Sequence, residues 1–347
     1  MIAVMPHDPS RRLLLRGLVL AGATMALAGC DEAAGRLPPS PTAGVEPDDP
    51  QTWPPDTELL ISARQRVHSF LLAAGAVAGA TGRMRQLTRL WGTELSTLEQ
   101  LITLGGVPLP ELRRAPVTDA PADDEAASTS SSSSGSASGP GPDDSSSTSD
   151  EARKIKPLEL GRALRRAVPD FVAEIASASP SNLALLTSLV AQQAASAELL
   201  GAPVDWSPLV APEGAAAVPL LAAARPAIFG LEVVAARSRG EERAKYEQVL
   251  DGVRALTRHL TTLAGAAAPV APLGYDLPGP LETAEQRLDL ARALVADIAP
   301  AALGTVQRVR GQIDPLFGVV RVVTESVTWT RTLGATIAPF PGMTLPG

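Results

Sequence analysis

Four glutamates are the side chains of this sequence whose type and spacing could hold a metal ion. They are Glu232, Glu247, Glu285 and Glu325, one on each of four predicted helical segments in the second half of the chain. If all four pointed inward, they would bind a cation through carboxylate oxygens alone. If they lie on the surface, they are solvated or paired with the many arginines. We expect the surface arrangement, and therefore no bound metal or other cofactor.

Two of these glutamates differ from the others because each lies inside an apolar stretch. Two valines follow Glu232, and Glu325 lies among several more. A carboxylate buried in such a stretch would need a partner or a raised pKa. The partners that the sequence suggests are Arg225, Arg292 and His259.

No other combination of residues predicts catalysis. Helical bundles that bind two irons place Glu-x-x-His on two of their helices. After residue 29 the only histidines are His68 and His259, and three positions before them stand Gln65 and Leu256. No Ser, His and Asp have the spacing of a hydrolase, and no glycine-rich phosphate loop is present. The sequence names no catalytic residue, and we do not expect an enzyme.

A different chemistry is indicated near the N-terminus by Cys30, the only cysteine of the chain. An apolar run too short to span a bilayer ends in Leu27, Ala28 and Gly29, directly before Cys30. This ending resembles a bacterial lipobox, in which the cysteine becomes the lipidated first residue of the mature protein. Residues 1–29 are then a signal peptide, and acyl chains on Cys30 hold the protein on a membrane. The alternative is an uncleaved signal anchor, in which Cys30 is a small apolar residue.

The signal segment also suggests the route of export. Arg11 and Arg12 stand in a pattern that resembles a twin-arginine signal, with Leu14 and Arg16 where that pattern prefers Phe and Lys. A signal of this kind implies export in the folded state. We expect the mature chain outside the cytoplasm, lipid-anchored to the outer face of the cytoplasmic membrane.

Composition predicts an all-α protein. Alanine and leucine are abundant, aromatic residues make up only 3% of the chain, and no alternating run indicates a strand. The net charge of −7 makes nucleic acid and anionic lipid headgroups unfavourable partners, because both are negatively charged. No segment after the signal peptide is an uninterrupted apolar run of about 18 residues, which a second membrane span would need.

Proline-rich and polar segments divide the chain. Residues 30–55 predict a disordered tether, and residues 116–152, rich in Ser, Gly, Pro and Asp, predict a disordered insertion. Residues 202–218 form a proline-rich connector. The rest carries apolar residues at three- and four-residue spacing and predicts two helical bundles. The first comprises 56–115 and 153–201, and the second comprises 219–342.

Capping residues indicate where several of these helices begin and end. Asp56 is the predicted N-cap of the first helix, and Gly105 ends the second. Ser179 followed by Pro180 predicts the start of the fourth helix, since a capping side chain precedes a proline at the first helical position.

The second bundle, 219–342, resembles a ferritin-like domain of unknown function found in actinobacterial envelope lipoproteins. The resemblance lies in the segment LAAARPAIFGLEVVAAR at 221–237, the long loop 266–280 and the final APFPG at 338–342. The region 56–201 is similar to the helical region that often precedes this domain. The resemblance implies four helices with one long crossover connection. Relatives often have Glu-His where this chain has Ala224-Arg225, so it does not imply a di-iron site here.

These observations lead to one predicted function and two alternatives. The prediction is a membrane-anchored, extracytoplasmic scaffold or interaction module without enzymatic activity. Its partners are the membrane, through the lipid anchor, and another envelope protein. The first alternative is a degenerate metal-binding or redox bundle that uses carboxylates only. The second is a carrier of an apolar ligand in the bundle core.

Overall fold

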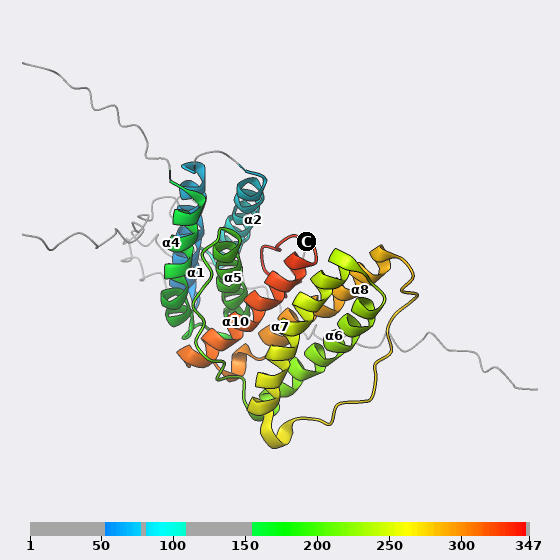
Figure 1. Cartoon of the computed structure of the whole chain (residues 1–347). Coiled ribbons are helices and arrows are strands. Elements are labelled where there is room, and N and C mark those ends of the chain that lie inside the picture. Colours follow the sequence, from blue (N-terminus) through cyan, green and yellow to red (C-terminus); the bar gives the residue numbers. More distant parts are fainter. Residues whose placement is uncertain (1–52, 78–80, 109–154, 345–347) are drawn as a thin grey trace, which may run out of the picture. The chain divides into compact units, whose positions relative to one another are not determined.

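Helices form the regular structure of residues 53–77, 81–108 and 155–344, the residues that the computed structural model describes (Figure 1). The only strand-like pairing within these ranges is an isolated bridge between Val77 and Ile155. The all-α fold predicted from composition is confirmed.

Several predictions fall outside these residues. They concern the signal peptide 1–29 with Arg11, Arg12, Leu27, Ala28 and Gly29, the lipidation site Cys30, the tether up to residue 52, and the insertion 116–152. They stay predictions, and the description that follows covers the part of the chain that begins at Trp53.

Four helices from the first half of the chain pack together. They are α1 (Thr57–Gly75), α2 (Gly82–Leu104), α4 (Pro157–Ile175) and α5 (Pro180–Leu199). Each contacts two of the others, in the pairs α1–α2, α1–α4, α4–α5 and α2–α5. The start of α5 at Ser179-Pro180 and the end of α2 at Gly105 are confirmed.

The order of contacts gives the directions of these helices. Arg64 of α1 lies 2.7 Å from Glu99 of α2. The Phe70 ring, later in α1, meets Trp91, earlier in α2, at a centroid distance of 6.3 Å. These contacts make α2 antiparallel to α1. Arg66 in the middle of α1 pairs with Glu174 near the end of α4, and Val77 just after α1 pairs with Ile155 just before α4, so α4 is antiparallel to α1 as well. α2 and α4 therefore point the same way.

The four long helices of the second half have the same order of directions as those of the first. Its elements are η2 (Gly214–Ala217), α6 (Val218–Ala236), α7 (Gly240–Ala264), η3 (Gly265–Ala267), α8 (Ala284–Ala296), α9 (Ile298–Leu303), η4 (Val306–Arg308) and α10 (Ile313–Thr332). α6 and α7 form an antiparallel hairpin. Arg287 of α8 bonds Ser238 just after α6, so α8 is antiparallel to α6 and parallel to α7. The connection 265–283 joins the end of α7 to the start of α8 and runs along α6 (Figure 1).

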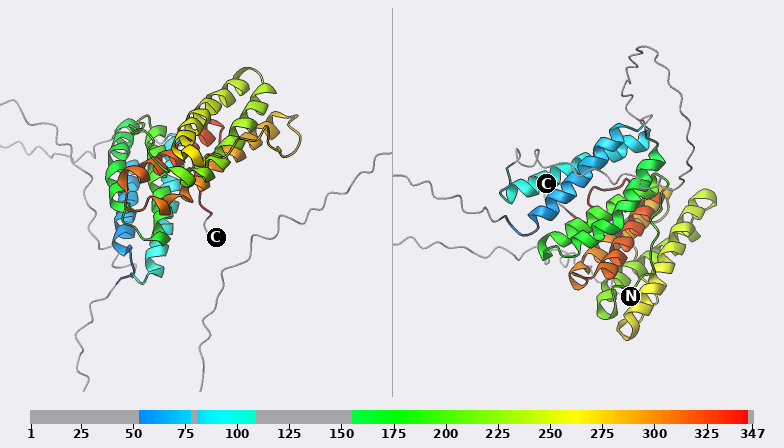
Figure 2. Two further views of the ribbon diagram at one scale, coloured as in Figure 1. Left: turned by 90° about the horizontal axis from the view of Figure 1, so that it is seen from below. Right: turned by 90° about the vertical axis from the view of Figure 1, so that its left-hand side faces the viewer.

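α5 and α10 join the two halves. They run parallel, because Thr324 Oγ1 donates to the Ala191 carbonyl at 3.3 Å and the later Thr328 donates to the later Glu198 at 2.6 Å. The right-hand view of Figure 2 shows α10 between α5 and the α6–α7 pair. A helix with neighbours on all sides must be apolar all round, and α5 has one charged residue, Glu198. The two predicted bundles thus pack on each other around one apolar core.

Asp56 is the N-cap residue of α1, as predicted, but its side chain does not cap that helix. Its backbone is left-handed, with φ 69°, and its carboxylate makes no hydrogen bond within α1. The carboxylate instead accepts hydrogen bonds at the start of α5, from the Ser179 N–H and from Asn182 Nδ2, both at 2.9 Å. Burial opposes ionisation, but the hydrogen bonds from Ser179 and Asn182 prevail and lower the pKa of Asp56. The cap of α5 therefore comes from another helix.

α6 is unusually apolar for a helix at the edge of the fold. With the turn before it, it forms the stretch Gly214–Ala236, which among the described residues is long and apolar enough to cross a membrane by length and composition alone. Its Leu220, Leu221 and Leu231 are buried against neighbouring helices. A core helix passes the same test of length and composition, and 44% of the apolar window of α6 is buried in the fold.

Candidate functional site

Glu232 and Glu325 have arginine partners, although not those that the sequence suggests. Arg254 Nη2 of α7 lies 2.6 Å from Glu232 Oε1, and Arg321 Nε lies 2.8 Å from Glu325 Oε1. Glu232 is not buried, since its side chain is 44% exposed. The expected partners are engaged elsewhere or face solvent: Arg225 donates to the Pro269 carbonyl, Arg292 to the Leu333 carbonyl, and His259 is exposed.

The other two glutamates also face solvent. Glu247 lies 2.7 Å from Arg243 within α7, and Glu285 is exposed in the first turn of α8. Across the described residues, no three His, Cys, Asp or Glu side chains form a group that could hold a metal ion. The structure does not bring the four glutamates together.

A fifth glutamate, which the sequence analysis did not single out, is completely buried. Glu94 of α2 has no exposed surface, and within the described part of the chain neither carboxylate oxygen has a hydrogen-bond partner. Burial raises the pKa of Glu94 well above its ordinary value. The neutral carboxylic acid is therefore the favoured form, because an ionised carboxylate without partners is costly in an apolar interior.

The position of Glu94 in the sequence carried a signal. It comes three residues after Trp91 and four before Leu98, and both of these are buried on the same face of α2. Residues three and four apart share a helix face. A charged residue on an otherwise apolar stripe is unusual, and the stripe alone was sufficient to find Glu94.

His68 lies at the same level of the α1–α2 hairpin. The contacts of Arg64 with Glu99 and of Phe70 with Trp91 fix the register, which places residue 68 opposite residue 94. The Nδ1 atom of His68 is buried and, like the Glu94 oxygens, has no hydrogen-bond partner among the described residues. Three polar atoms without partners thus belong to two side chains at one level.

The buried carboxylic acid of Glu94 can hold a proton. It does not bond His68, since neither the Glu94 oxygens nor His68 Nδ1 has a hydrogen-bond partner among the described residues. The two side chains offer fewer ligands than the three or four protein groups that hold zinc. The arrangement therefore favours proton binding in the interior of the first bundle over metal binding. It is the strongest candidate for chemistry in the described residues.

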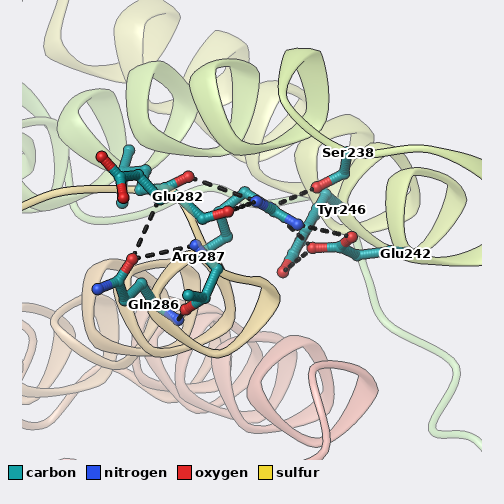
Figure 3. Close-up of polar contacts among 8 residues, drawn as sticks. Ser238, Glu242, Tyr246, Glu282, Gln286 and Arg287 are labelled. Atoms are coloured by element: carbon teal, nitrogen blue, oxygen red, sulfur yellow. Dashed lines mark hydrogen bonds and ion pairs between the residues drawn. The ribbon is translucent and has the colours of Figure 1, made fainter.

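A second polar cluster joins α6, α7 and α8 in the other half of the molecule (Figure 3). Arg287 donates two hydrogen bonds to the Glu242 carboxylate, at 2.9 and 3.0 Å, and one to Ser238 Oγ at 3.0 Å. It also donates to the backbone carbonyl of Glu282 at 2.9 Å, at the end of the long connection. The buried Tyr246 lies beside Glu242, with 3.4 Å between the phenol and carboxylate oxygens.

The protonation states of this cluster follow from its contacts. The hydrogen bonds from Arg287 lower the pKa of Glu242 and raise that of Arg287. Burial, with the nearby Glu242 charge, raises the pKa of Tyr246 to about 12. All three side chains keep their usual forms at neutral pH and have partners, so the cluster acts as a clamp that fixes the connection to the α6–α7 hairpin.

The largest side chains serve the core. Trp91 is buried in the first bundle. Trp329 packs over Gly252, where a Cβ atom would lie 2.6 Å from the indole Nε1. A pocket of about 200 Å³ lies between α8, α10 and the C-terminal segment, beside Val327 and Ile337. This volume is below the roughly 300–1,000 Å³ of typical small-molecule sites.

Comparison with protein-family models, curated proteins and solved structures finds no match to this chain. The resemblance of 219–342 to a ferritin-like domain stays a prediction. Arguments about function therefore rest on the sequence and on the geometry of the described residues.

Proposed function

We propose that this chain is an exported lipoprotein, anchored through Cys30 to the outer face of the cytoplasmic membrane. Its helical body acts there as a non-enzymatic scaffold or interaction module for another envelope protein. The observation that carries the proposal is that the glutamates of the second bundle do not converge on one site. Glu232, Glu247 and Glu325 pair with arginines, the first two exposed and Glu325 half-buried, and Glu285 is exposed. The net charge of −7 makes nucleic acid a poor partner.

The second bundle, 219–342, is ferritin-like in this proposal. Two antiparallel pairs of helices, with the second and third helices parallel and a long connection between them, support that assignment. The first bundle has the same directions of helices, and the predicted insertion 116–152 stands at the equivalent place between α2 and α4. The ion pairs of the glutamates argue against a carboxylate-only metal or redox bundle. The pocket beside Val327 is too small for a typical ligand, but hollows of about 760 Å³ beside Met84 and about 600 Å³ beside Phe70 keep a carrier of an apolar ligand as the alternative.

The anchor is tested by replacing Cys30 with Ala in the full chain. We expect the unaltered protein in the membrane fraction, with an N-terminal peptide that begins at Cys30 and carries the mass of acyl chains. The Cys30→Ala protein should lose that mass and the cleavage before residue 30. An unmodified Cys30 in the unaltered protein would refute the lipoprotein assignment. Replacing Arg11 and Arg12 with Lys should block export if the twin-arginine route is used.

The scaffold role is tested by elemental analysis of residues 31–347 produced with iron, manganese and zinc in excess. We expect less than one tightly bound metal per two chains. One or two bound metals per chain, lost when Glu232 and Glu325 are replaced with Gln, would instead support the carboxylate-only bundle. Chemical cross-linking on intact cells should join the anchored protein to an envelope protein at a single, reproducible mass.

A further inference from the structure

The connection between α7 and α8 exposes apolar side chains in an ordered segment. Val270 is 96% exposed and Leu273 is fully exposed, the highest values among the large apolar residues that the structure describes. Exposed apolar residues that gather in one place often mark an interaction surface. We call residues 265–274 the apolar loop.

The apolar loop is held in place on both sides of these two residues. Arg225 of α6 donates a hydrogen bond to the Pro269 carbonyl at 2.6 Å. Beyond Leu273, the Tyr275 ring packs on Phe229 of α6, with 5.8 Å between centroids. The connection buries Leu281, further along, in the core. Val270 and Leu273 are therefore displayed outward between two fixed points.

The apolar loop itself carries no charge, although the chain as a whole is acidic and its net charge disfavours anionic lipid headgroups. Residues 252–275 contain no Asp or Glu, and the exposed Asp276 follows three residues after Leu273. η3, which begins the loop, contacts η2, and both turns consist of Gly and Ala only. Arg258 and His259 are exposed on α7, about 10 Å along the helix axis from the loop. Glu213, just before η2, is the acidic residue nearest in sequence to these turns.

Apolar tips with basic residues behind them suit the interface of an anionic membrane. The apolar side chains enter the boundary between headgroups and acyl chains, and the cations stay at the level of the phosphates. A protein partner with an acidic, apolar surface would use some of the same chemistry. The membrane is favoured because Val270 and Leu273 are almost fully exposed, and small apolar projections need no shaped partner to enter lipid.

We propose that the apolar loop, with Arg258 and His259, is a second membrane contact that inserts Val270 and Leu273 into the interface of an anionic bilayer. The inference rests on the proposed location of the protein beside a membrane. With the lipid anchor it gives two attachment points, so the second bundle would be held against the bilayer while the anchor keeps the local concentration high.

The test is co-sedimentation of residues 31–347, which retain every described contact and lack the lipid, with vesicles. The vesicles contain 30 mol% phosphatidylglycerol in phosphatidylcholine, or phosphatidylcholine alone. We expect binding to the anionic vesicles that weakens with added salt. Val270→Glu combined with Leu273→Glu should lower the partition coefficient about tenfold or more, since two apolar contacts are replaced by charges that anionic lipid repels.

The matched control is Leu104→Glu, which places the same charge at another exposed leucine, 77% exposed at the end of α2. It should bind like the unaltered chain, and circular dichroism should show that all variants stay folded. Absence of binding to anionic vesicles, or equal losses in the loop and control variants, would overturn the proposal. So would cross-linking of the loop to a protein without vesicle binding. The vesicle test does not depend on Cys30. The membrane contact of the loop can therefore be refuted while the lipoprotein assignment holds, and the lipoprotein assignment can be refuted while the loop still binds vesicles.

Discussion

At the scale of single residues, Glu94 departs most from what a helical bundle requires. Buried polar groups in proteins almost always have hydrogen-bond partners. Glu94 has none among the described residues, and neither has Nδ1 of His68 at the same level. Such a group reduces stability, so its presence at the centre of a hairpin is a reason to test it for a function in proton binding.

Replacing Glu94 with Gln should remove a pH dependence of stability. The pKa of Glu94 is raised by folding, so the folded state keeps a proton that the unfolded chain releases near its ordinary pKa of 4.5. The free energy of unfolding should therefore fall as the pH rises above about 4.5, until the folded pKa is passed. Thermal unfolding between pH 4.5 and 8 should show a steeper decline of Tm for the unaltered protein than for Glu94→Gln.

Glu58→Gln is the control for this experiment, because Glu58 is exposed on the neighbouring helix α1. It should leave the pH dependence of Tm unchanged. Parallel curves for the unaltered protein and Glu94→Gln would mean that Glu94 does not carry a raised pKa. A companion variant, His68→Asn, reports whether the imidazole shares the titration, since it should then alter the pH at which Tm begins to fall.

At the scale of helices, the sequence predicts more than it does for single side chains. The apolar spacing placed each long helix, because the period of 3.6 residues is a property of the backbone and does not depend on the partner helix. Asp56 shows where this reasoning ends. Its type and position predicted that its side chain caps α1. Its carboxylate oxygens instead accept hydrogen bonds from the start of α5, which lies more than 120 residues later in the sequence and comes near only in the folded chain.

One arginine partner of the glutamates could also be predicted from the sequence, and the other could not. Arg321 could be found from Glu325, since four residues separate them on one helix. Arg254, the partner of Glu232, could not, because that pair depends on the register between α6 and α7. Glu94 was missed although its signal was local: the apolar stripe of α2 was used to place the helix, and the charged residue on it was not questioned.

Close packing of α7 on α10 gives a prediction at this scale. A Cβ atom on Gly252 would lie 2.6 Å from Nε1 of Trp329, so the indole would have to move. Gly252→Ala should lower the free energy of unfolding by about 1–3 kcal/mol. Gly92→Ala in α2 is the matched control, because a Cβ there meets nothing within 4 Å. It should raise stability by about 0.5–1 kcal/mol. Urea unfolding measures both, and equal effects of the two changes would contradict the packing described.

At the scale of the whole molecule, one apolar core extends through both halves, with α5 and α10 at its centre. α5 contributes to the interior of the first half and also packs on α10 of the second. Neither half can lose its structure without exposing the apolar surface of the other. The described helices should therefore unfold as one cooperative unit.

Asp56→Ala tests this cooperativity. Losing the cap of α5 should lower the free energy of unfolding by about 1–2 kcal/mol. Hydrogen exchange followed by mass spectrometry should show the same loss of protection in the slowest peptides of α2 and α7, although the Asp56 carboxylate bonds the start of α5. Asp205→Ala is the control, since the Asp205 side chain is 90% exposed in its ion pair with Arg165. Loss of protection confined to the first half would show that the two halves unfold separately.

The parallel contact of α5 and α10 has one more consequence. Bonds between the two helices and their flanking turns join residues 127, 130 and 133 positions apart, a nearly constant interval. Each helix is also the last of a set with the same sequence of directions. A twofold dimer with parallel helices at its interface makes contacts at a constant interval of this kind. In such a dimer every mutation appears twice. Here each half can change alone, and the first has an interior acid while the second displays apolar residues to its surroundings.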